Sequence, residues 1–260
     1  MIDVLVSGAA GRMGGEVVKA VTAADGMRVV AAVDPNAAGG VVNDGSGATI
    51  VVMGDLTAAL AQTVPHVMVD FTHPTAVEGN VRTALAAGVH CVVGTTGVPL
   101  ALLQALSTEN PGPCLFMAPN FAIGAVLLMR FAGQAARYMP HVEIIELHHD
   151  RKADAPSGTA ILTAAIIAGA RREVPAAPGR ETEIAEGARG ALVDGVCVHS
   201  IRLPGLVAHQ EVIFGGVGQT LTLRHDSIDR TSFMPGVVLA VRAVGEHAGF
   251  IMGLDAFMED

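Results

Sequence analysis

Short apolar runs and longer amphipathic stretches alternate along the first 120 residues. The apolar runs are rich in valine and lack a polar face, which is typical of strands buried on both sides. They predict strands at residues 2–6, 28–33, 49–53, 66–71, 90–93 and 114–117. Helices are predicted between them at 13–24, 56–62, 77–87 and 100–106. This alternation predicts an α/β fold, a parallel sheet with helices on both faces.

The pattern changes beyond residue 120. Helices are predicted at 121–138, 158–170 and 231–247, and strands at 142–149, 196–202, 209–214 and 220–225. The stretch 171–195 is rich in proline, glycine and charge and is predicted to be a loop. A glycine-rich run at 215–218 is a hairpin signal between the last two strands. Strands that follow one another without helices predict a second, α+β domain with an antiparallel or mixed sheet.

Composition narrows the kinds of partner. Hydrophobic residues make up 51% of the 260 residues and the mean hydropathy is +0.49, so a membrane span has to be tested. The longest uncharged run, 83–108, is interrupted by glycines and Pro99, which predicts several elements and no span. A net charge of −9 without a basic run disfavours nucleic-acid binding. Three cysteines without metal-ligand spacing, and a start without a signal-peptide pattern, predict a cytoplasmic protein with no metal site.

A glycine-rich turn follows the first predicted strand. Gly8, Gly11 and Gly14 have the spacing G-x-x-G-x-x-G and lead into a helix. Glycines there let the backbone approach a pyrophosphate, which the helix N-terminus attracts. Asp34 ends the second strand, where a carboxylate can accept hydrogen bonds from a ribose. The turn and Asp34 together predict a dinucleotide site, although Asp34 and Pro35 have an alternative interpretation as a simple turn.

Two later turns fall at equivalent places. Gly94-Thr95-Thr96-Gly97 follows one predicted strand, and Ala118-Pro119-Asn120-Phe121 follows the next. Ligands of open parallel sheets bind outside the carboxyl ends of the strands, so both turns are expected near the dinucleotide. Spacing alone is equally compatible with ordinary turns.

The densest chemistry lies between residues 146 and 160. His148 and His149 come at a strand end, Lys152 follows, and a helix begins near Gly158 and Thr159. Cationic side chains and a helix N-terminus suit an anionic substrate, and a histidine can transfer protons near neutral pH. A solvated rim is the alternative interpretation of the two histidines. A shared zinc ion is disfavoured, because adjacent residues of a strand point to opposite faces.

These segments resemble the signature of dihydrodipicolinate reductases. The resemblance is carried by His148–Lys152 with Asp154–Ala160, and by Gly8–Gly14, Asp70–Pro74, Gly94–Gly97, Ala118–Phe121, Arg202–Gly205, His209–Val212, Arg224–Ser227 and Arg230–Phe233. It covers almost the whole chain. It implies a Rossmann-like nucleotide domain, residues 1–120 with 228–260, and a central α+β domain, 121–227, for substrate binding and homotetramer formation. It also implies reduction of 4-hydroxy-tetrahydrodipicolinate (dihydrodipicolinate) to tetrahydrodipicolinate by NADH or NADPH, in the diaminopimelate route to lysine.

The family pattern also implies residue roles. His148 would be the proton donor or acceptor and Lys152 a proton donor. The substrate, a small dicarboxylate, would contact His149, Gly158 and Thr159. The cofactor would contact Gly8, Ala9, Ala10, Gly11, Arg12, Met13, Asp34, Gly94, Thr95, Thr96, Ala118, Pro119, Asn120 and Phe121.

Two positions depart from the family pattern. Arg151 stands where several relatives have a third histidine, and Pro35 where some have an arginine that could hold a 2′-phosphate. Asp34 repels a 2′-phosphate and Arg12 attracts it. The sequence therefore predicts that NADH works at least as well as NADPH.

Two other functions compete with this interpretation. An aspartate-semialdehyde type of dehydrogenase needs an activated cysteine. Cys91 and Cys197 fall in apolar strand patterns and Cys114 begins another, so none has the expected setting. A nucleotide-sensing binding module would not need His148 and Lys152 beside a helix N-terminus.

Overall fold

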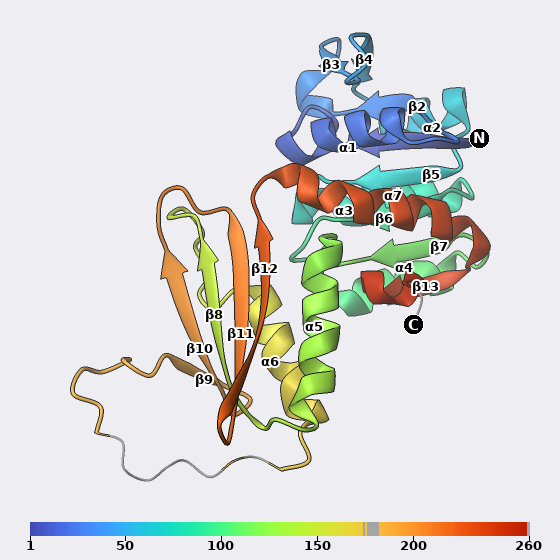
Figure 1. Ribbon diagram of the computed structural model, residues 1–260. Helices are drawn as coiled ribbons and strands as arrows, with labels where there is room; N and C mark the ends of the chain where they lie inside the picture. The colour runs from blue at the N-terminus through green and yellow to red at the C-terminus, as the bar shows by residue number, and fades with distance from the viewer. Residues whose placement is uncertain (174, 176–181, 259–260) are drawn as a thin grey trace. The chain divides into compact units, whose positions relative to one another are not determined.

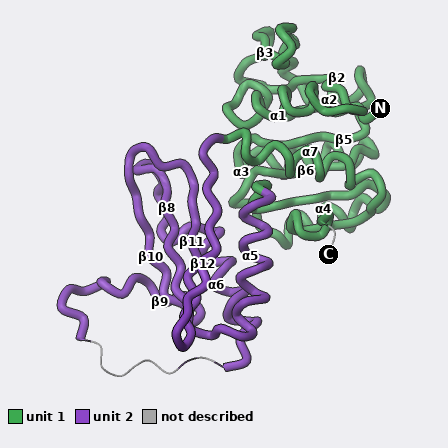
Figure 2. Tube along the Cα trace, viewed as in Figure 1, with its two compact units in different colours: residues 1–122, 230–260 green, residues 123–229 purple. Residues whose placement is uncertain are grey.

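The computed structural model describes residues 1–173, 175 and 182–258 (Figure 1). The chain forms two compact units, Met1–Ala122 with Arg230–Asp260, and Ile123–Asp229 (Figure 2). The first unit is made from both ends of the chain and the second from its middle. Each unit has its own sheet.

An eight-stranded sheet is the centre of the first unit, with strand order β13-β7-β6-β5-β1-β2-β4-β3 (Figure 1). Its strands are β1 (Ile2–Ser7), β2 (Met27–Val33), β3 (Val41–Asn43), β4 (Thr49–Met53), β5 (Val67–Asp70), β6 (His90–Val93), β7 (Cys114–Met117) and β13 (Gly249–Met252). Neighbouring strands are parallel except β3, which is antiparallel to β4. The predicted parallel α/β sheet is confirmed. Every residue of β5 and β7 is buried, as expected for strands covered on both faces.

Two groups of helices cover this sheet. On one face, α1 (Arg12–Ala23) packs against α7 (Met234–Ala243); on the other, α3 (Pro74–Ala86) contacts α2 (Leu56–Thr63) and α4 (Leu100–Glu109) (Figure 1). Local signals start these helices. The Asp55 side chain caps α2 by accepting from the Ala58 N–H at 3.0 Å, and a proline opens α3. The core between sheet and helices contains the fully buried Leu5, Met68 and Leu103.

The ends of the first unit differ from the sequence prediction. The pattern does not predict β3 and β13, because β3 has three residues with Val41 exposed and no residue of β13 is fully buried. The predicted helix 231–247 is divided into η2 (Arg230–Phe233), α7 and η3 (Val244–Glu246). Pro235 has no N–H to continue a helix begun at 231, so it occupies the first turn of α7 instead.

A five-stranded sheet forms the second unit, in the order β12-β11-β8-β10-β9. Its strands are β8 (His141–His148), β9 (Ala191–Val193), β10 (Val196–Arg202), β11 (Ala208–Gly216) and β12 (Gln219–Ser227). Only β8 and β10 are parallel, so the predicted mixed sheet is confirmed. The helices α5 (Ile123–Ala136) and α6 (Gly158–Ala170) pack together against one face. Ile144, Val212 and Phe214 are fully buried beneath them.

The segment predicted as a loop at 171–195 contains one strand. Residues 174 and 176–181 lie outside the described part of the chain. Further on, β9 pairs antiparallel with β10 through a turn at Asp194 and Gly195, which both have positive φ. Such a two-residue turn suits a tight hairpin, but a three-residue strand is too short to give a periodic signal.

No helix in the described residues is long and apolar enough to cross a membrane.

Candidate active site

The predicted cofactor residues meet at one edge of the first unit's sheet. Strands β7, β6, β5, β1 and β2 are neighbours in that order and run parallel. Their carboxyl ends therefore lie along one edge. The turns at Gly8–Met13, Gly94–Thr96 and Ala118–Phe121 follow β1, β6 and β7, and Asp34 follows β2. Strand order brings these four segments together, although they are far apart in the sequence.

The glycine turn after β1 is shaped by close backbone approaches. Gly8 has φ +79°, and a Cβ there would lie 2.4 Å from the carbonyl oxygen of Phe71. A Cβ on Gly14 would lie 2.0 Å from the carbonyl oxygen of Gly8. A side chain at Gly8 would therefore push the turn away from the end of β5, and a side chain at Gly14 would push α1 away from the turn.

The start of α1 leaves backbone donors available. Gly11 is its N-cap and offers no side-chain oxygen to the first turn. Among the described residues, no acceptor contacts the backbone N–H of Arg12 or Met13. Unpaired N–H groups at a helix N-terminus, together with the helix dipole, fit the pyrophosphate of a dinucleotide.

Asp34 serves as a turn cap and still has a second oxygen to offer. Its Oδ1 accepts from the backbone N–H of Asn36 at 3.1 Å. Its Oδ2 accepts no hydrogen bond from the described residues, and the side chain is half-buried. The turn and ribose interpretations of Asp34 are therefore compatible. Arg12 is exposed and forms no ion pair within the described chain.

A buried carboxylate joins two of the turns, and the sequence interpretation did not include it as a site residue. Asp70, at the end of β5, is fully buried. Its Oδ1 accepts from the hydroxyls of Thr72 at 2.8 Å and Thr95 at 2.9 Å, and its Oδ2 accepts from Asn80 Nδ2 at 2.8 Å. Thr95 is one of the predicted cofactor residues, so Asp70 holds that turn in place. An acidic residue that ends an apolar strand was the signal available in the sequence.

The predicted catalytic segment lies entirely in the second unit. Strand β8 ends at His148, so the prediction that it continues through His149 is wrong by one residue. The chain turns there, and the Lys152 N–H donates to the His149 carbonyl at 3.2 Å. Further along, Ser157 caps α6 by accepting from the Ala160 N–H at 3.2 Å. The segment therefore connects the end of β8 to the start of α6.

Glu146 lies at the centre of this segment and is fully buried. Its carboxylate contacts His148 Nδ1 at 2.5 Å and pairs with both terminal nitrogens of Arg202 at 2.7 and 2.8 Å. Burial raises the pKa of Glu146, but hydrogen bonds from His148, Arg202 and Ser200 outweigh it and lower the pKa to about 2. Glu146 is therefore an anion beside His148. Neither it nor Arg202 was predicted as a site residue, because their contact joins positions 56 residues apart.

The remaining predicted residues surround this anion. The Lys152 ammonium contacts both carboxylate oxygens of Asp154, at 2.8 and 2.9 Å, and this contact lowers the pKa of Asp154. His149 Nδ1 is buried without a hydrogen-bond partner in the described residues. Gly158, the first residue of α6, is exposed, and its N–H has no acceptor among the described residues. These features suit binding of a carboxylate near the N-terminus of α6.

The cysteines do not suit nucleophilic catalysis. Cys91 and Cys114 are buried. Burial raises the pKa of the Cys114 thiol to about 11, and raises that of Cys91 as well. A reactive cysteine needs a lowered pKa and an adjacent base, so these two thiols do not support the aspartate-semialdehyde type of chemistry.

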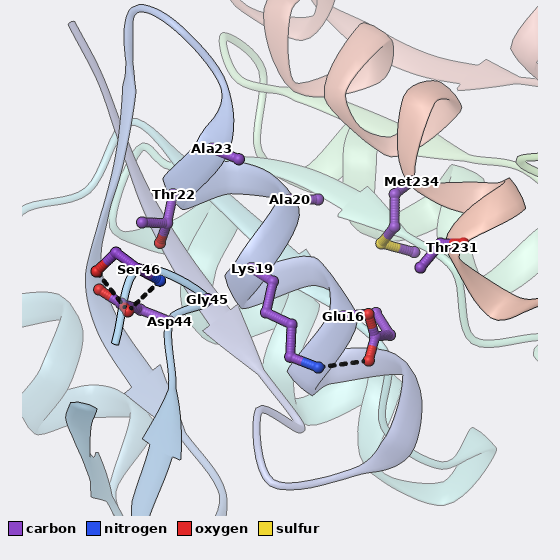
Figure 3. A pocket seen from close by; sticks show the side chains of 10 residues that line it. All are labelled: Glu16, Lys19, Ala20, Thr22, Ala23, Asp44, Gly45, Ser46, Thr231 and Met234. Atoms are coloured by element: carbon purple, nitrogen blue, oxygen red, sulfur yellow. Dashed lines mark hydrogen bonds and ion pairs between the residues drawn. The ribbon is translucent and has the colours of Figure 1, made fainter. Parts of the chain in front are cut away.

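Two cavities of the first unit lie away from the predicted residues. One of about 500 Å³ is bordered by α1, the loop at Asp44–Ser46 and the start of α7, and the ion pair between Lys19 and Glu16 lies on its wall (Figure 3). A second, of about 600 Å³, is bordered by α4 and the start of β13. Neither of these two contains a predicted site residue.

Comparison with known proteins covers both units. The family description "Dihydrodipicolinate reductase, N-terminus" matches residues 2–121, and "Dihydrodipicolinate reductase, C-terminus" matches residues 124–258. The 4-hydroxy-tetrahydrodipicolinate reductase of Nocardia farcinica (strain IFM 10152) is 50% identical over 99% of both chains. That of Mycobacterium sp. (strain KMS) is 49% identical over 98% of both chains.

Solved structures agree with the sequence comparison. The dipicolinate-bound dihydrodipicolinate reductase from Paenisporosarcina sp. TG-14 has a TM-score of 0.86 and 42% identity, covering 99% of this chain and 100% of that one. An amine dehydrogenase from Mycobacterium smegmatis, at 16% identity and a TM-score of 0.66 over 98% of this chain and 95% of that one, shares the fold alone. Because the family matches span both units and the identities extend over nearly the full length, this chain belongs to the dihydrodipicolinate reductase family.

Proposed function

We propose that this chain reduces 4-hydroxy-tetrahydrodipicolinate, or the dihydrodipicolinate formed from it by loss of water, to tetrahydrodipicolinate, in the diaminopimelate route to lysine. Membership of the reductase family supports this reaction. The observation that carries the proposal is the segment between β8 and α6. In this segment the buried Glu146 carboxylate holds the His148 imidazole, and the Lys152 ammonium pairs with Asp154. The segment ends at the start of α6, where a backbone N–H is unpaired.

The first unit would hold a nicotinamide cofactor, which supplies the hydride when bound. The pyrophosphate would lie against the turn Gly8–Met13 and the start of α1, where backbone donors are available. Asp34 would accept from the ribose with its second oxygen. The turns Gly94–Thr96 and Ala118–Phe121 would line the rest of the molecule, with Asp70 keeping Thr95 in place.

The second unit would bind the substrate through its carboxylates. Gly158 and Thr159 begin α6, and the positive end of the helix dipole favours an anion there. His149 would also contact the substrate, as the family pattern implies. The Paenisporosarcina relative is described as bound to dipicolinate, which is itself a small dicarboxylate.

Two side chains would move the proton that the reduction requires. Hydride addition leaves an anionic, enamine-like product, and a positioned acid accelerates its protonation. His148 would donate to it or accept from it, and Lys152 would donate. The contact with Asp154 holds the Lys152 ammonium group in place in the loop.

Self-association is supported by the sheet of the second unit. Its helices pack on one face, whereas Ile145, Ile201 and Ile213 lie half-buried on the other. No helix of the described chain covers that face within the second unit. Apolar side chains on a helix-free sheet face suit contact with further copies of the chain, which we propose form a homotetramer. A cytoplasmic location fits the three free cysteines.

A coupled assay tests the reaction. The condensation product of pyruvate and aspartate semialdehyde is supplied fresh by its synthase, and the decay of nicotinamide absorbance is followed. His148→Gln and Lys152→Ala should each lower kcat at least about tenfold, because each removes a proton donor. Both should keep the wild-type Kd for the nucleotide. Wild-type turnover by either variant would contradict its role, and nucleotide binding without any turnover by the wild type would favour a sensing module.

A further inference from the structure

The environment of Glu146 replaces all the water that its carboxylate loses on burial. An ionised carboxylate without donors would strongly destabilise the fold. Oε1 accepts from Arg202 Nη2 at 2.7 Å and from the Ser157 N–H at 3.2 Å. Oε2 contacts Arg202 Nη1 at 2.8 Å and His148 Nδ1 at 2.5 Å. Together with the Ser200 side chain, donors from three parts of the second unit therefore converge on one carboxylate.

The same network reaches the loop that carries Lys152. Arg202 Nη2 also donates to the backbone carbonyl of Asp154 at 2.7 Å. The carboxylate of Asp154 in turn receives the Lys152 ammonium at 2.8 Å. The pair of Glu146 and Arg202 is therefore connected to both proposed proton donors.

This arrangement determines where the imidazole proton lies. The guanidinium of Arg202 and the N–H of Ser157 can only donate hydrogen bonds, so the Glu146 carboxylate must accept from both of them. An ionised carboxylate has no proton to donate, so it can only accept from His148 as well. The proton of the neutral imidazole must then be on Nδ1, which leaves Nε2 for another partner. Glu146 on β8 contacts the ring of His148, and Arg202 on β10 and Ala208 on β11 pair with His148 in the sheet. The charged residues Asp150 and Arg151 and the Lys152–Asp154 pair follow in the loop, and the first turn of α6 has no acidic residue.

We propose that Glu146 is a positioning residue for the reduction. Its carboxylate holds the His148 ring by Nδ1, so that Nε2 is available to donate or accept the proton. The same carboxylate fixes the Ser157 amide at the start of α6. The proposal rests on the proposed function of the segment between β8 and α6. Because one carboxylate holds both groups, the imidazole keeps a constant relation to the helix start where a substrate carboxylate is proposed to bind.

The first test needs no substrate. Wild-type protein labelled with ¹⁵N-histidine is titrated by NMR, with the His148 signals assigned from their loss in His148→Gln. The neutral ring should carry its proton on Nδ1. In Glu146→Gln the neutral ring should lose its preference for a proton on Nδ1, because an amide side chain can donate to that nitrogen as well as accept from it. Glu143→Gln is the matched control, since Glu143 is on the same strand, faces the other way and contacts His199 at 2.7 Å. It should leave the His148 signals unchanged.

Kinetics provide a second readout. Glu146→Gln should lower kcat at least about tenfold with a smaller change in the substrate KM. Glu146→Asp keeps a carboxylate that can only accept from Nδ1, so it should retain more of the wild-type kcat than Glu146→Gln.

Each outcome decides the proposal. A neutral wild-type His148 protonated on Nε2 would overturn it, and this result needs no variant to fold. An unchanged preference for the Nδ1 tautomer in folded Glu146→Gln would overturn it as well. If the wild type shows the expected tautomer and Glu146→Gln loses it, but the wild type has no reductase activity, the proposed reaction fails while the orientation of His148 by Glu146 stands.

Discussion

Asp34 and Arg12 act on the same end of the proposed cofactor with opposite charges. Asp34 has one oxygen in a turn cap and the other available, and Arg12 has no ion pair in the described chain. The carboxylate favours a ribose hydroxyl and repels a 2′-phosphate, whereas the guanidinium can pair with that phosphate. If the two effects differ by no more than about 1.4 kcal/mol, discrimination stays within about tenfold. We propose that NADH serves at least as well as NADPH.

Substitution of these two residues tests the cofactor preference. Asp34→Asn keeps an oxygen for the Asn36 amide but loses the charge, so kcat/KM should shift toward NADPH. Arg12→Ala should shift it toward NADH. Asp55→Asn is the control, since Asp55 also caps a helix of this unit and faces no proposed ligand. All kcat/KM values should be measured at one ionic strength, because salt screens the charges of Asp34 and Arg12. A wild type that prefers NADPH by about a hundredfold would show that Asp34 does not face the ribose.

At the scale of elements, the start of α6 offers a direct test of substrate binding. Ser157 has φ −67° and ψ 152°, a conformation compatible with a following proline, and proline is well accepted at the first position of a helix. Gly158→Pro should therefore keep α6 and its Ser157 cap but remove one backbone N–H. The substrate KM should rise by about fivefold or more, as expected when a hydrogen bond to a charged group is lost, while the Kd for the nucleotide stays the same.

Alanine at the same position is the matched control. A Cβ on Gly158 would meet no atom within 4 Å, and alanine keeps the N–H. Gly158→Ala should therefore bind substrate like the wild type. If calorimetry gave equal substrate affinity for the proline and alanine variants, the carboxylate would have to bind elsewhere.

At the scale of the whole molecule, the helix-free sheet face predicts how assembly can be broken. Ile213 is half-buried on that face, so Ile213→Asp should place a charge in the proposed contact and yield species smaller than a tetramer. Val217→Asp adds the same charge at the fully exposed tip of the hairpin between β11 and β12 and should leave assembly unchanged. Light scattering after gel filtration measures both. A wild type that is monomeric at micromolar concentration would contradict the proposed tetramer.

Local sequence was sufficient for most elements of the fold. Apolar runs of four or more residues specify strands such as β6 and β7, because strands covered on both faces have few polar positions. The cap at Ser157 is equally local, since it depends on its own backbone and on the Ala160 N–H three residues later. Elements without such signals were missed. Pairing partners alone create β3, β9 and β13, as each has three or four residues.

The sequence by itself determined the α/β class, the glycine turn and the reactive segment at His148–Lys152, because each is written in contiguous residues. Only the tertiary structure decided which distant groups meet. Glu146 looks like an ordinary strand residue until Arg202, 56 positions later, and the Ser157 amide converge on it. Asp70 likewise gains its role from Thr95 and Asn80. Buried polar groups must find partners wherever the fold brings them, and that choice depends on strand order and register rather than on neighbouring residues.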